Sequence, residues 1–286
     1  MESDSRWLRT PALFGSVHDA IERGRSSHLA QGKRGLAELT RLTGFVTVLG
    51  LWQLMSATGI LATWGLPGPA VVAHTLWRLV ATGTLGHNLE VSLLRVLEGV
   101  VIGCGVGGSL GIVSGLFSLG ERLIDAPMQA LRMLPHLALL PFLIVVMGSG
   151  ELSKVVLIAL GSFFPIYVNL FAGIRGIDGK LIEVGRSLGL SWLQLLRHVI
   201  LPGALPQVLV GLRQSLGVAW LSLFVAEQVN ATAGLGYLMQ DAQELLHTDV
   251  LLICIGVYGI LGLVTDAMVR WIERSALCWR HAPLGM

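Results

Sequence analysis

The sequence predicts an all-α membrane protein with six transmembrane helices. Of its 286 residues, 53% are hydrophobic and only 13% are charged, whereas a typical soluble protein has about 25% charged residues. Apolar segments of roughly 20 residues or more recur along the chain, and each could cross a hydrocarbon core ~30 Å thick. We place the six spans at about 42–62, 89–117, 123–147, 152–172, 207–229 and 250–272.

The spans divide the chain into a membrane domain with two polar tails. Residues 1–41 form the first tail, residues 42–275 the membrane domain, and residues 276–286 the second tail. We expect no secretory signal peptide, because a long mixed-charge segment precedes the first apolar run. A short amphipathic helix over about 70–82 should lie at the membrane surface. The net charge of +2, without basic runs interleaved with aromatics, argues against nucleic-acid binding.

One predicted span carries a glycine at every fourth position. This spacing places the glycines along one face of a helix, where small residues let helix backbones approach closely in a bilayer. The glycines are Gly99, Gly103, Gly107, Gly111 and Gly115. The same stretch also matches the dinucleotide pattern G-x-G-x-x-G, but no predicted strand precedes it, so we reject a nucleotide fold here.

No phosphate-binding loop is evident for ATP. Residues 148–154 resemble one, but Ser153 replaces the glycine that should precede Lys154. The three cysteines, Cys104, Cys254 and Cys278, lack metal-ligand spacing, and we interpret those in apolar runs as small buried hydrophobic residues.

Lysine and arginine gather on one side of the predicted bundle. With six spans, 15 of the 20 Lys and Arg residues fall in the tails and loops of one side, against two on the other. Because positive loops stay in the cytoplasm, both termini should be cytoplasmic, together with the connection 175–206.

That connection is much longer than a turn. Its pattern predicts a helix over Glu183–Leu188 that stops at Gly189, then a second helix over Ser191–Val199 that Pro202 ends. Long structured connections are often functional. Two interpretations stay open at this point: a helix pair resting on the bilayer, or a handle that another protein grips.

Ionisable residues inside spans are functional candidates, because charge in a bilayer is costly. Glu227 could be a gate or helix–helix contact, or could touch a substrate. Arg95 and Glu98 are spaced to neutralise each other, and Arg213 should snorkel towards the cytoplasmic end. Arg132 and His136 should share a helix face one turn apart. Pro127, Pro135 and Pro141 should kink this span. The simpler interpretations are an ion pair or a carbonyl cap beside the Pro135 break for Arg132, and a packed, hydrogen-bonded ring for His136.

Four residues of the 175–206 connection match the EAA-type motif of binding-protein-dependent ABC importer permeases. They are Glu183, Gly189, Leu201 and Pro202. Further stretches resemble the nitrate/sulfonate/taurine permease family, and within it the aliphatic sulfonate permeases. These stretches are Pro135–Pro141, Phe164–Asp178, His198–Pro206, Val225–Leu238 and Thr248–Val250.

The match has three departures. Val184 and Gly185 stand where two alanines are usual, and Val199 stands where isoleucine is frequent. Gly185 should weaken the first helix by roughly 1 kcal/mol.

The resemblance implies a type I ABC importer permease with both termini in the cytoplasm. The 175–206 connection would dock on a cytosolic ATPase, with Glu183 in polar contact, Gly189 at the turn and Pro202 at the return to the fifth span. The wider coupling set is Glu183, Gly185, Arg186, Ser187, Gly189, Leu201 and Pro202.

The implied assembly is a permease homodimer in a bacterial plasma (inner) membrane. It would include two ATP-binding subunits and an external binding protein. The chain itself would have no catalytic residue, metal or cofactor, because the partner ATPase binds ATP.

The implied substrate is an aliphatic sulfonate, with taurine, nitrate or another small anion as alternatives. An oxyanion needs hydrogen-bond donors, which makes Arg132, His136, Asn169 and Ser222 candidates for the pathway, with Glu227 as a gate. The loop 230–249 carries Asp241, Glu244 and Asp249, and could form the binding-protein docking surface or a solvated loop.

Two other classes of function compete with a permease. A membrane-embedded enzyme would need catalytic groups at one depth, and the pattern offers none. A passive channel would have no use for the cytoplasmic helix pair.

Overall fold

The computed structural model describes residue 47 and residues 50–59, 65–229 and 231–277. The chain divides into two compact units, residues 1–70 and residues 71–286. About half of the predicted first span, 42–62, lies outside the described residues, as do the whole predicted first tail, 1–41, and most of the predicted second tail, 276–286. In the first unit, residues 51–57 are helical, and the Trp52 indole donates to the carbonyl of Pro67 at 3.2 Å.

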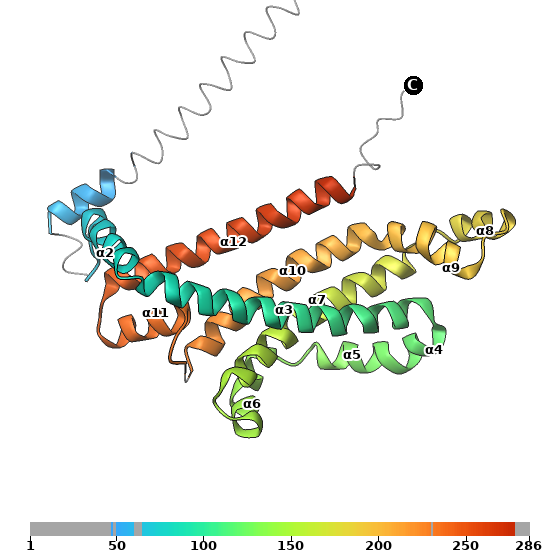
Figure 1. The fold of residues 1–286 in the computed structure, drawn as a ribbon, viewed down its shortest axis with the longest axis horizontal. Coiled ribbons are helices and arrows are strands. Elements are labelled where there is room, and N and C mark those ends of the chain that lie inside the picture. Colours follow the sequence, from blue (N-terminus) through green and yellow to red (C-terminus); the bar gives the residue numbers. More distant parts are fainter. Residues whose placement is uncertain (1–46, 48–49, 60–64, 230, 278–286) are drawn as a thin grey trace, which may run out of the picture. The chain divides into compact units, whose positions relative to one another are not determined.

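Helices account for every element of regular structure among the described residues, as the composition predicts (Figure 1). The α-helices are α2 (Pro69–Ala81), α3 (Thr84–Leu116), α4 (Ser118–Gly120), α5 (Ala126–Leu131), α6 (Leu140–Met147), α7 (Glu151–Arg175), α8 (Gly179–Ser187), α9 (Trp192–Leu195), α10 (Leu201–Glu227), α11 (Leu235–Glu244) and α12 (Thr248–Ala276). Two π-helical turns, η2 (Glu121–Asp125) and η4 (Leu196–Ile200), and one 3₁₀ turn, η3 (His136–Leu139), lie between them.

Four of these helices are long and apolar enough to cross a membrane. They are α3, α7, the continuous helix Trp192–Glu227 and α12, and a bent pair of shorter helices would make a fifth span if counted as one. They correspond to the second to sixth predicted spans.

The predicted third span, 123–147, is broken at Pro135, as expected, and the bend is too sharp for its two halves to act as one helix. Its halves, Ser118–Leu131 and His136–Met147, are bent by 82°. Pro135 has an extended ψ of 96°, and a proline also disfavours helical geometry at the residue before it. Arg132 and His136 therefore do not share a helix face.

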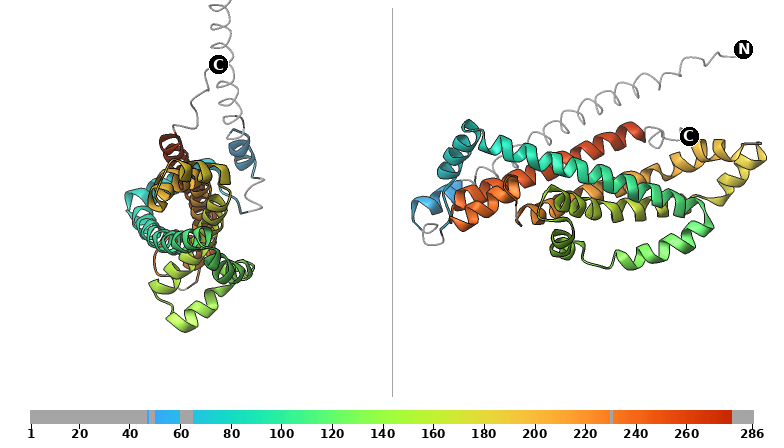
Figure 2. Two further views of the ribbon diagram at one scale, coloured as in Figure 1. Left: turned by 90° about the vertical axis from the view of Figure 1, so that its right-hand side faces the viewer. Right: turned by 60° about the horizontal axis from the view of Figure 1, so that its bottom comes forward.

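Helix α3 packs directly along α7 (Figure 2), and its glycine face forms this contact, as the spacing predicts. A Cβ added at Gly103 would lie 2.1 Å from the Ser162 hydroxyl and 2.3 Å from the carbonyl of Ala159. At Gly107 it would lie 2.5 Å from the carbonyl of Phe163. Only glycine lets the two backbones come this close.

Serines join α3, α7 and α10 within this apolar interior. Ser215 on α10 donates to the carbonyl of Ser162 at 2.6 Å. Ser162 in turn donates to the carbonyl of Gly99 at 3.3 Å. Hydrogen bonds between small residues support helix association in a bilayer, where the hydrophobic effect offers little drive.

Pro202 does not end a helix, contrary to the sequence prediction. The helix that begins at Trp192 runs through the π-helical turn η4 into α10 and ends at Glu227. The wide turn ends at Ile200, two residues before Pro202, whose ring removes one backbone donor and would crowd the preceding turn. A π-helical turn thus accommodates the proline without breaking the helix.

The turn between α8 and α9 confirms the predicted stop at Gly189. Gly189 has φ +77°, its N–H donates to the carbonyl of Arg186 at 2.9 Å, and the Leu190 N–H donates to the carbonyl of Gly185 at 3.1 Å. This pattern is a Schellman cap. Ser191 and Gln194 then form a capping box at the start of α9.

The α8–α9 pair also shows what Gly185 does. Gly185 is buried, and a Cβ there would lie 2.6 Å from Leu195 Cδ1. Leu195 is only 1% exposed. The absence of a side chain at Gly185 lets α9 pack closely on α8. This packing offsets the poor helix propensity of glycine.

Two glycines of α3 give a matched test of the α3–α7 contact. Gly103→Val should destabilise the protein by about 1–3 kcal/mol or more, because the added atoms meet a fixed backbone carbonyl. Gly105→Val should have little effect, because a Cβ there meets no atom within 4 Å. Thermal unfolding of the purified variants in detergent would measure the difference, and equal melting temperatures would contradict the packing described here.

Candidate functional site

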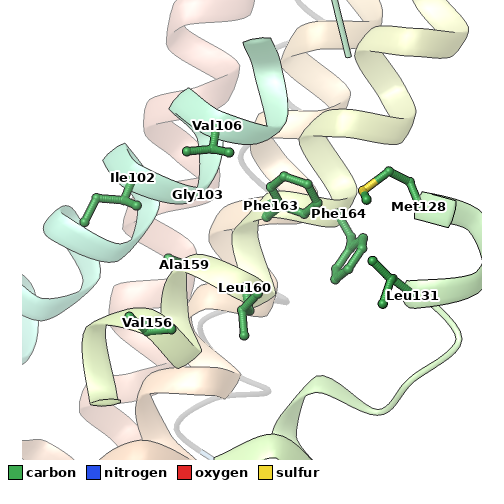
Figure 3. Close-up of a pocket in the computed structure, with 10 residues that line it drawn as sticks. All are labelled: Ile102, Gly103, Val106, Met128, Leu131, Val156, Ala159, Leu160, Phe163 and Phe164. Atoms are coloured by element: carbon green, nitrogen blue, oxygen red, sulfur yellow. The ribbon is translucent and has the colours of Figure 1, made fainter. Parts of the chain in front are cut away.

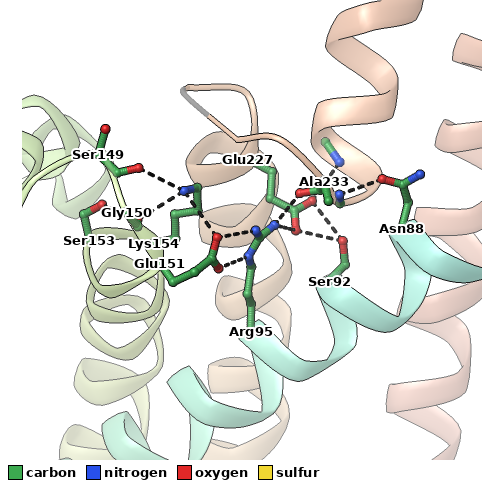
Figure 4. Close-up of polar contacts among 12 residues, drawn as sticks. Asn88, Ser92, Arg95, Ser149, Gly150, Glu151, Ser153, Lys154, Glu227 and Ala233 are labelled. Carbon is green, nitrogen blue, oxygen red and sulfur yellow. Dashed lines mark hydrogen bonds and ion pairs between the residues drawn. The ribbon is translucent and has the colours of Figure 1, made fainter.

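A buried carboxylate lies at the C-terminal end of α10. Glu227 is the last residue of α10 and is 0% exposed. It accepts hydrogen bonds from the Ser92 hydroxyl at 2.8 and 2.9 Å, from Arg95 Nη1 at 2.8 Å and from the Gly236 N–H at 2.8 Å (Figure 4). These donors come from α3 and from α11.

Arg95 connects this carboxylate to α7. Its guanidinium makes two hydrogen bonds of 2.6 Å to Glu151, and it donates to the carbonyl of Ala233 at 2.6 Å. The Arg95 side chain is 5% exposed, whereas that of Glu151 is 63% exposed. Lys154 Nζ lies 3.6 Å from Glu151 and donates to the carbonyls of Ser149 and Gly150. A charged chain thus runs from the surface to the buried Glu227.

The turn before α11 is fixed by the same cluster. Asn88 accepts from the Gly234 N–H at 2.7 Å, and Ser92 accepts from the Leu235 N–H at 2.8 Å. Gly234 has φ +124°, and a Cβ there would lie 2.4 Å from the Glu227 carboxylate. The backbone can wrap around the carboxylate only because this residue is glycine.

The predicted Arg95–Glu98 pair is wrong. Arg95 is buried and pairs with Glu227 and Glu151, whereas Glu98 is exposed. Spacing of i and i+3 shows only that two side chains could meet. For Glu227, the structure shows helix–helix polar contact, since protein donors surround the carboxylate.

Four members of this cluster were not predicted from the sequence: Ser92, Asn88, Glu151 and Gly234. Small polar residues and an acid at a helix start are common, so none of them stood out. Gly234 and Gly236 could have indicated this cluster. A buried carboxylate can accept hydrogen bonds from a backbone turn only if the turn comes close to it, and glycine permits that approach.

The structure brings His136 and Ser222 together and leaves Arg132 apart from them. His136 Nε2 lies 3.1 Å from Ser222 Oγ, and Ser222 also donates to the carbonyl of Val218. Gly161 leaves room for this pair, since a Cβ there would lie 2.3 Å from Ser222 Oγ. Arg132 is exposed just after α5. Asn169 instead donates to Gln214 at 2.9 Å.

Arg213 does not simply snorkel, contrary to the sequence prediction. Its Nη2 donates to Glu273 at 2.7 Å, and its Nε lies 3.3 Å from Asp266 as an ion pair without hydrogen-bond geometry. Arg270 also pairs with Asp266. These carboxylates belong to α12, so the pairs join α10 to α12.

The surface of α8 and α9 mixes charged and apolar residues. Glu183, Arg186 and Ser187 are exposed. Large apolar side chains are exposed beside them: Leu181, Val184, Leu188, Trp192 and Leu193. An exposed apolar patch with charges around it is typical of a protein-binding surface. Leu201 is exposed and Pro202 partly buried, and Pro202 borders a groove of about 440 Å³ together with Asp178 and Gln207.

A second cavity, of about 350 Å³, lies between α3, α5 and α7 (Figure 3). Only apolar residues and a glycine line it, among them Met128, Phe163 and Phe164. Because an oxyanion needs donors, this cavity is unsuited to one.

The chain matches the family described as "Binding-protein-dependent transport system inner membrane component" over residues 107–277. The "Putative aliphatic sulfonates transport permease protein SsuC" of Escherichia coli (strain K12) is 47% identical over 237 residues, covering 83% of this chain and 90% of that protein. The protein of the same name in Bacillus subtilis (strain 168) is 41% identical over 238 residues, covering 83% and 86%. In fold, a chain of an amino acid ABC transporter crystallised with histidines is similar, with a TM-score of 0.59 at 20% identity, covering 70% of this chain and 97% of that one.

Arg95 and Glu98, three residues apart on α3, provide a test of the buried cluster. Arg95→Met should destabilise the protein by about 3–5 kcal/mol, because it leaves the buried Glu227 without its cation. Glu98→Gln should change stability by no more than about 0.5 kcal/mol. Adding Glu227→Gln to Arg95→Met should recover part of the loss, as denaturant unfolding in detergent would show. Equal effects of the two single variants would instead support an Arg95–Glu98 pair.

Proposed function

The chain belongs to the family of binding-protein-dependent transport system inner membrane components, and from this membership we propose which anion it carries and how ATP drives it. It is the permease subunit of a bacterial ABC importer, spans the inner membrane several times and is not itself catalytic. We propose aliphatic sulfonates as its substrates. The observation that carries this proposal is the identity of 41–47%, over most of the chain, to two permeases named for aliphatic sulfonates. Taurine, nitrate or another small anion would suit the same framework.

We further propose six spans with both termini in the cytoplasm. The helices at 84–276 provide four spans or, with the bent pair, five, and the apolar segment 42–62 provides another. The distribution of Lys and Arg supports the orientation. In this arrangement residues 1–41 and 276–286 are cytoplasmic tails, residues 42–275 are the permease domain, and residues 175–206 are its coupling loop.

The coupling loop is proposed to dock on the ATPase through α8 and α9. The exposed Glu183, Arg186 and Ser187 offer polar contacts, and the exposed apolar side chains around them offer area to bury. The left-handed Gly189 sets the angle between the two helices. Leu201 and Pro202 lie where the same helix continues into α10, so movement of the loop passes directly into a spanning helix.

The complete transporter is proposed to contain two copies of this permease, two ATP-binding subunits and one external binding protein. The loop around α11 supports docking of the binding protein, because Asp241 and Glu244 are exposed there. Asp249 is less available, since it accepts a hydrogen bond from Thr75 at 2.6 Å.

For the substrate pathway we propose Arg132, His136, Asn169 and Ser222, with Glu227 as part of a gate. Arg132 is an exposed cation at the break in the bent span. His136 contacts Ser222 on α10, and Asn169 on α7 donates to Gln214 on α10, so these polar side chains lie along the surface of α10. Glu227 is enclosed by protein donors, which favours gating over direct contact with an anion.

Glu183→Ala tests the coupling proposal. It should lower co-purification of the ATPase and ATP-driven sulfonate uptake together, because a polar contact on the docking surface is lost. Glu244→Ala, an exposed glutamate on α11, should leave ATPase co-purification unchanged. The first assay is a pull-down of the tagged permease. The second is uptake by proteoliposomes, with the binding protein on the side that corresponds to the outside of the cell. If Glu183→Ala retains both properties, α8 is not the docking site.

A further inference from the structure

One stripe of α10 is left uncovered by the rest of the described chain, and what we infer from it rests on the proposed anion transport. Of the 27 residues of α10, 20 are buried or half-buried against the rest of the described chain. Beyond the first turn, the exposed positions are Gln207, Val210, Gln214, Gly217 and Leu221. Their spacing of three and four residues places them on one face of the helix.

Two glutamines make this stripe unlike a lipid-facing surface. Gln207 and Gln214 are seven residues apart, so they lie about 10.5 Å apart along the axis and within about 20° of the same direction. Gln214 is at the middle of α10. An amide exposed to hydrocarbon has no partner for its hydrogen bonds and is costly there.

The spanning helix α12 shows what a lipid-facing stripe looks like in the same chain. Its exposed positions from 255 to 268 are all apolar or glycine: Ile255, Gly256, Gly259, Ile260, Leu263, Val264, Ala267 and Met268. The contrast indicates that the α10 stripe faces something polar.

The hydrogen bonds of Asn169 determine which way the Gln214 amide points. Asn169 Nδ2 donates to the carbonyl of Pro165 at 2.8 Å, and a carbonyl can only accept, so this atom is the amide nitrogen. The same nitrogen donates to Gln214 Oε1 at 2.9 Å. The Gln214 NH₂ group therefore points away from Asn169, and it donates to no other side chain or backbone group within the described part of the protein.

We propose that this stripe lines the path of the anion, and that the Gln214 NH₂ group donates hydrogen bonds to the sulfonate oxygens as the anion passes. Asn169 is a positioning residue, because it holds the Gln214 oxygen and so turns the donors outward. Gln207, which borders the groove beside Pro202, continues the stripe towards the coupling segment.

A neutral donor suits transport better than a fixed cation does. An ion in a pathway must bind well enough to enter and weakly enough to leave. The residue before Gln214, Arg213, is a cation, but it is already paired with Asp266 and Glu273. An amide offers donors to the oxyanion without the stronger, charge-assisted attraction of a guanidinium.

The first test measures ATP-driven uptake of ethanesulfonate by the complete transporter in proteoliposomes. Gln214→Leu should lower kcat/KM about 10- to 100-fold, the range expected for loss of a hydrogen bond to a charged group. Gln214→Glu should lower it further, since a carboxylate repels the anion. Wild-type kcat/KM in Gln214→Leu would overturn the inference and leave the proposed function standing.

Two glycines provide a matched steric test in the same assay. A Cβ at Gly217 or at Gly259 meets no atom within 4 Å, so leucine at either position should fold. Gly217→Leu fills the α10 stripe and should block uptake, whereas Gly259→Leu lies on the apolar face of α12 and should not. Full uptake by Gly217→Leu would contradict a path along the stripe.

A labelling test does not depend on the identity of the substrate. In a background with Cys104, Cys254 and Cys278 replaced by alanine, a cysteine introduced by Gln214→Cys should react with 2-sulfonatoethyl methanethiosulfonate, a water-soluble anionic reagent. Leu263→Cys on α12 should react slowly or not at all. A Gln214→Cys variant that cross-links between two copies and resists the reagent would overturn the inference, because the stripe would then be a subunit contact.

The labelling result also separates the two proposals. If the wild-type transporter takes up no sulfonate, the proposed substrate fails. Rapid labelling of Gln214→Cys would then still support an anion path along α10, and no labelling would overturn it.

Discussion

The hydrogen-bonded ion pair between Arg95 and Glu227 is the interaction on which the arrangement of the helices depends. Neither residue could be buried alone without a large penalty, and a buried pair is tolerated only when its other hydrogen-bonding positions are also satisfied. Ser92, Glu151, the Ala233 carbonyl and the Gly236 N–H satisfy them. The pair thereby connects α3, α7, α10 and the turn before α11 at one place.

The helix that carries Glu227 is long enough to join this cluster to the proposed coupling loop. The helix begins at Trp192, in the proposed coupling loop, and continues for 36 residues, or about 54 Å at 1.5 Å per residue. Its two ends are the docking segment and the buried carboxylate. The π-helical turn η4 and Pro202 lie near the first end. Helices bend most readily at such turns and prolines. Along its middle, the glycine and serine contacts with α7 hold it closely, while the glutamine stripe is left uncovered.

Patterns that depend on backbone geometry were predicted well from the sequence. The α3 glycines and Gly189 are examples, because an added Cβ would come within about 2–3 Å of α7 at the former, and a left-handed turn favours glycine at the latter. Prolines were less informative. Pro135 breaks the third predicted span, as expected for a proline there, whereas Pro202 is accommodated by a π-helical turn and does not end the helix that it was predicted to end. A proline removes one donor in either case, and the surrounding packing decides whether the helix continues.

The ionic partners of Arg95 and Arg213 could not be predicted, because they are distant in the sequence. Arg95 pairs with Glu227 and not with Glu98, since tertiary packing turns its side chain inward. The asparagine and serines that complete the cluster had no local pattern to identify them. The break at Pro135 likewise separates Arg132 from His136, a relation that depended on an unbroken helix.

Hydrogen exchange at the turn before α11 tests most directly whether Glu227 holds these elements together. The N–H groups of Gly234, Leu235 and Gly236 donate to Asn88, Ser92 and Glu227. In the wild-type protein they should exchange slowly. In Glu227→Gln they should exchange at least about 10-fold faster, as loss of the charge-assisted bonds implies, while amides in the middle of α7 keep their rates. Unchanged exchange at residues 234–236 in that variant would contradict the account.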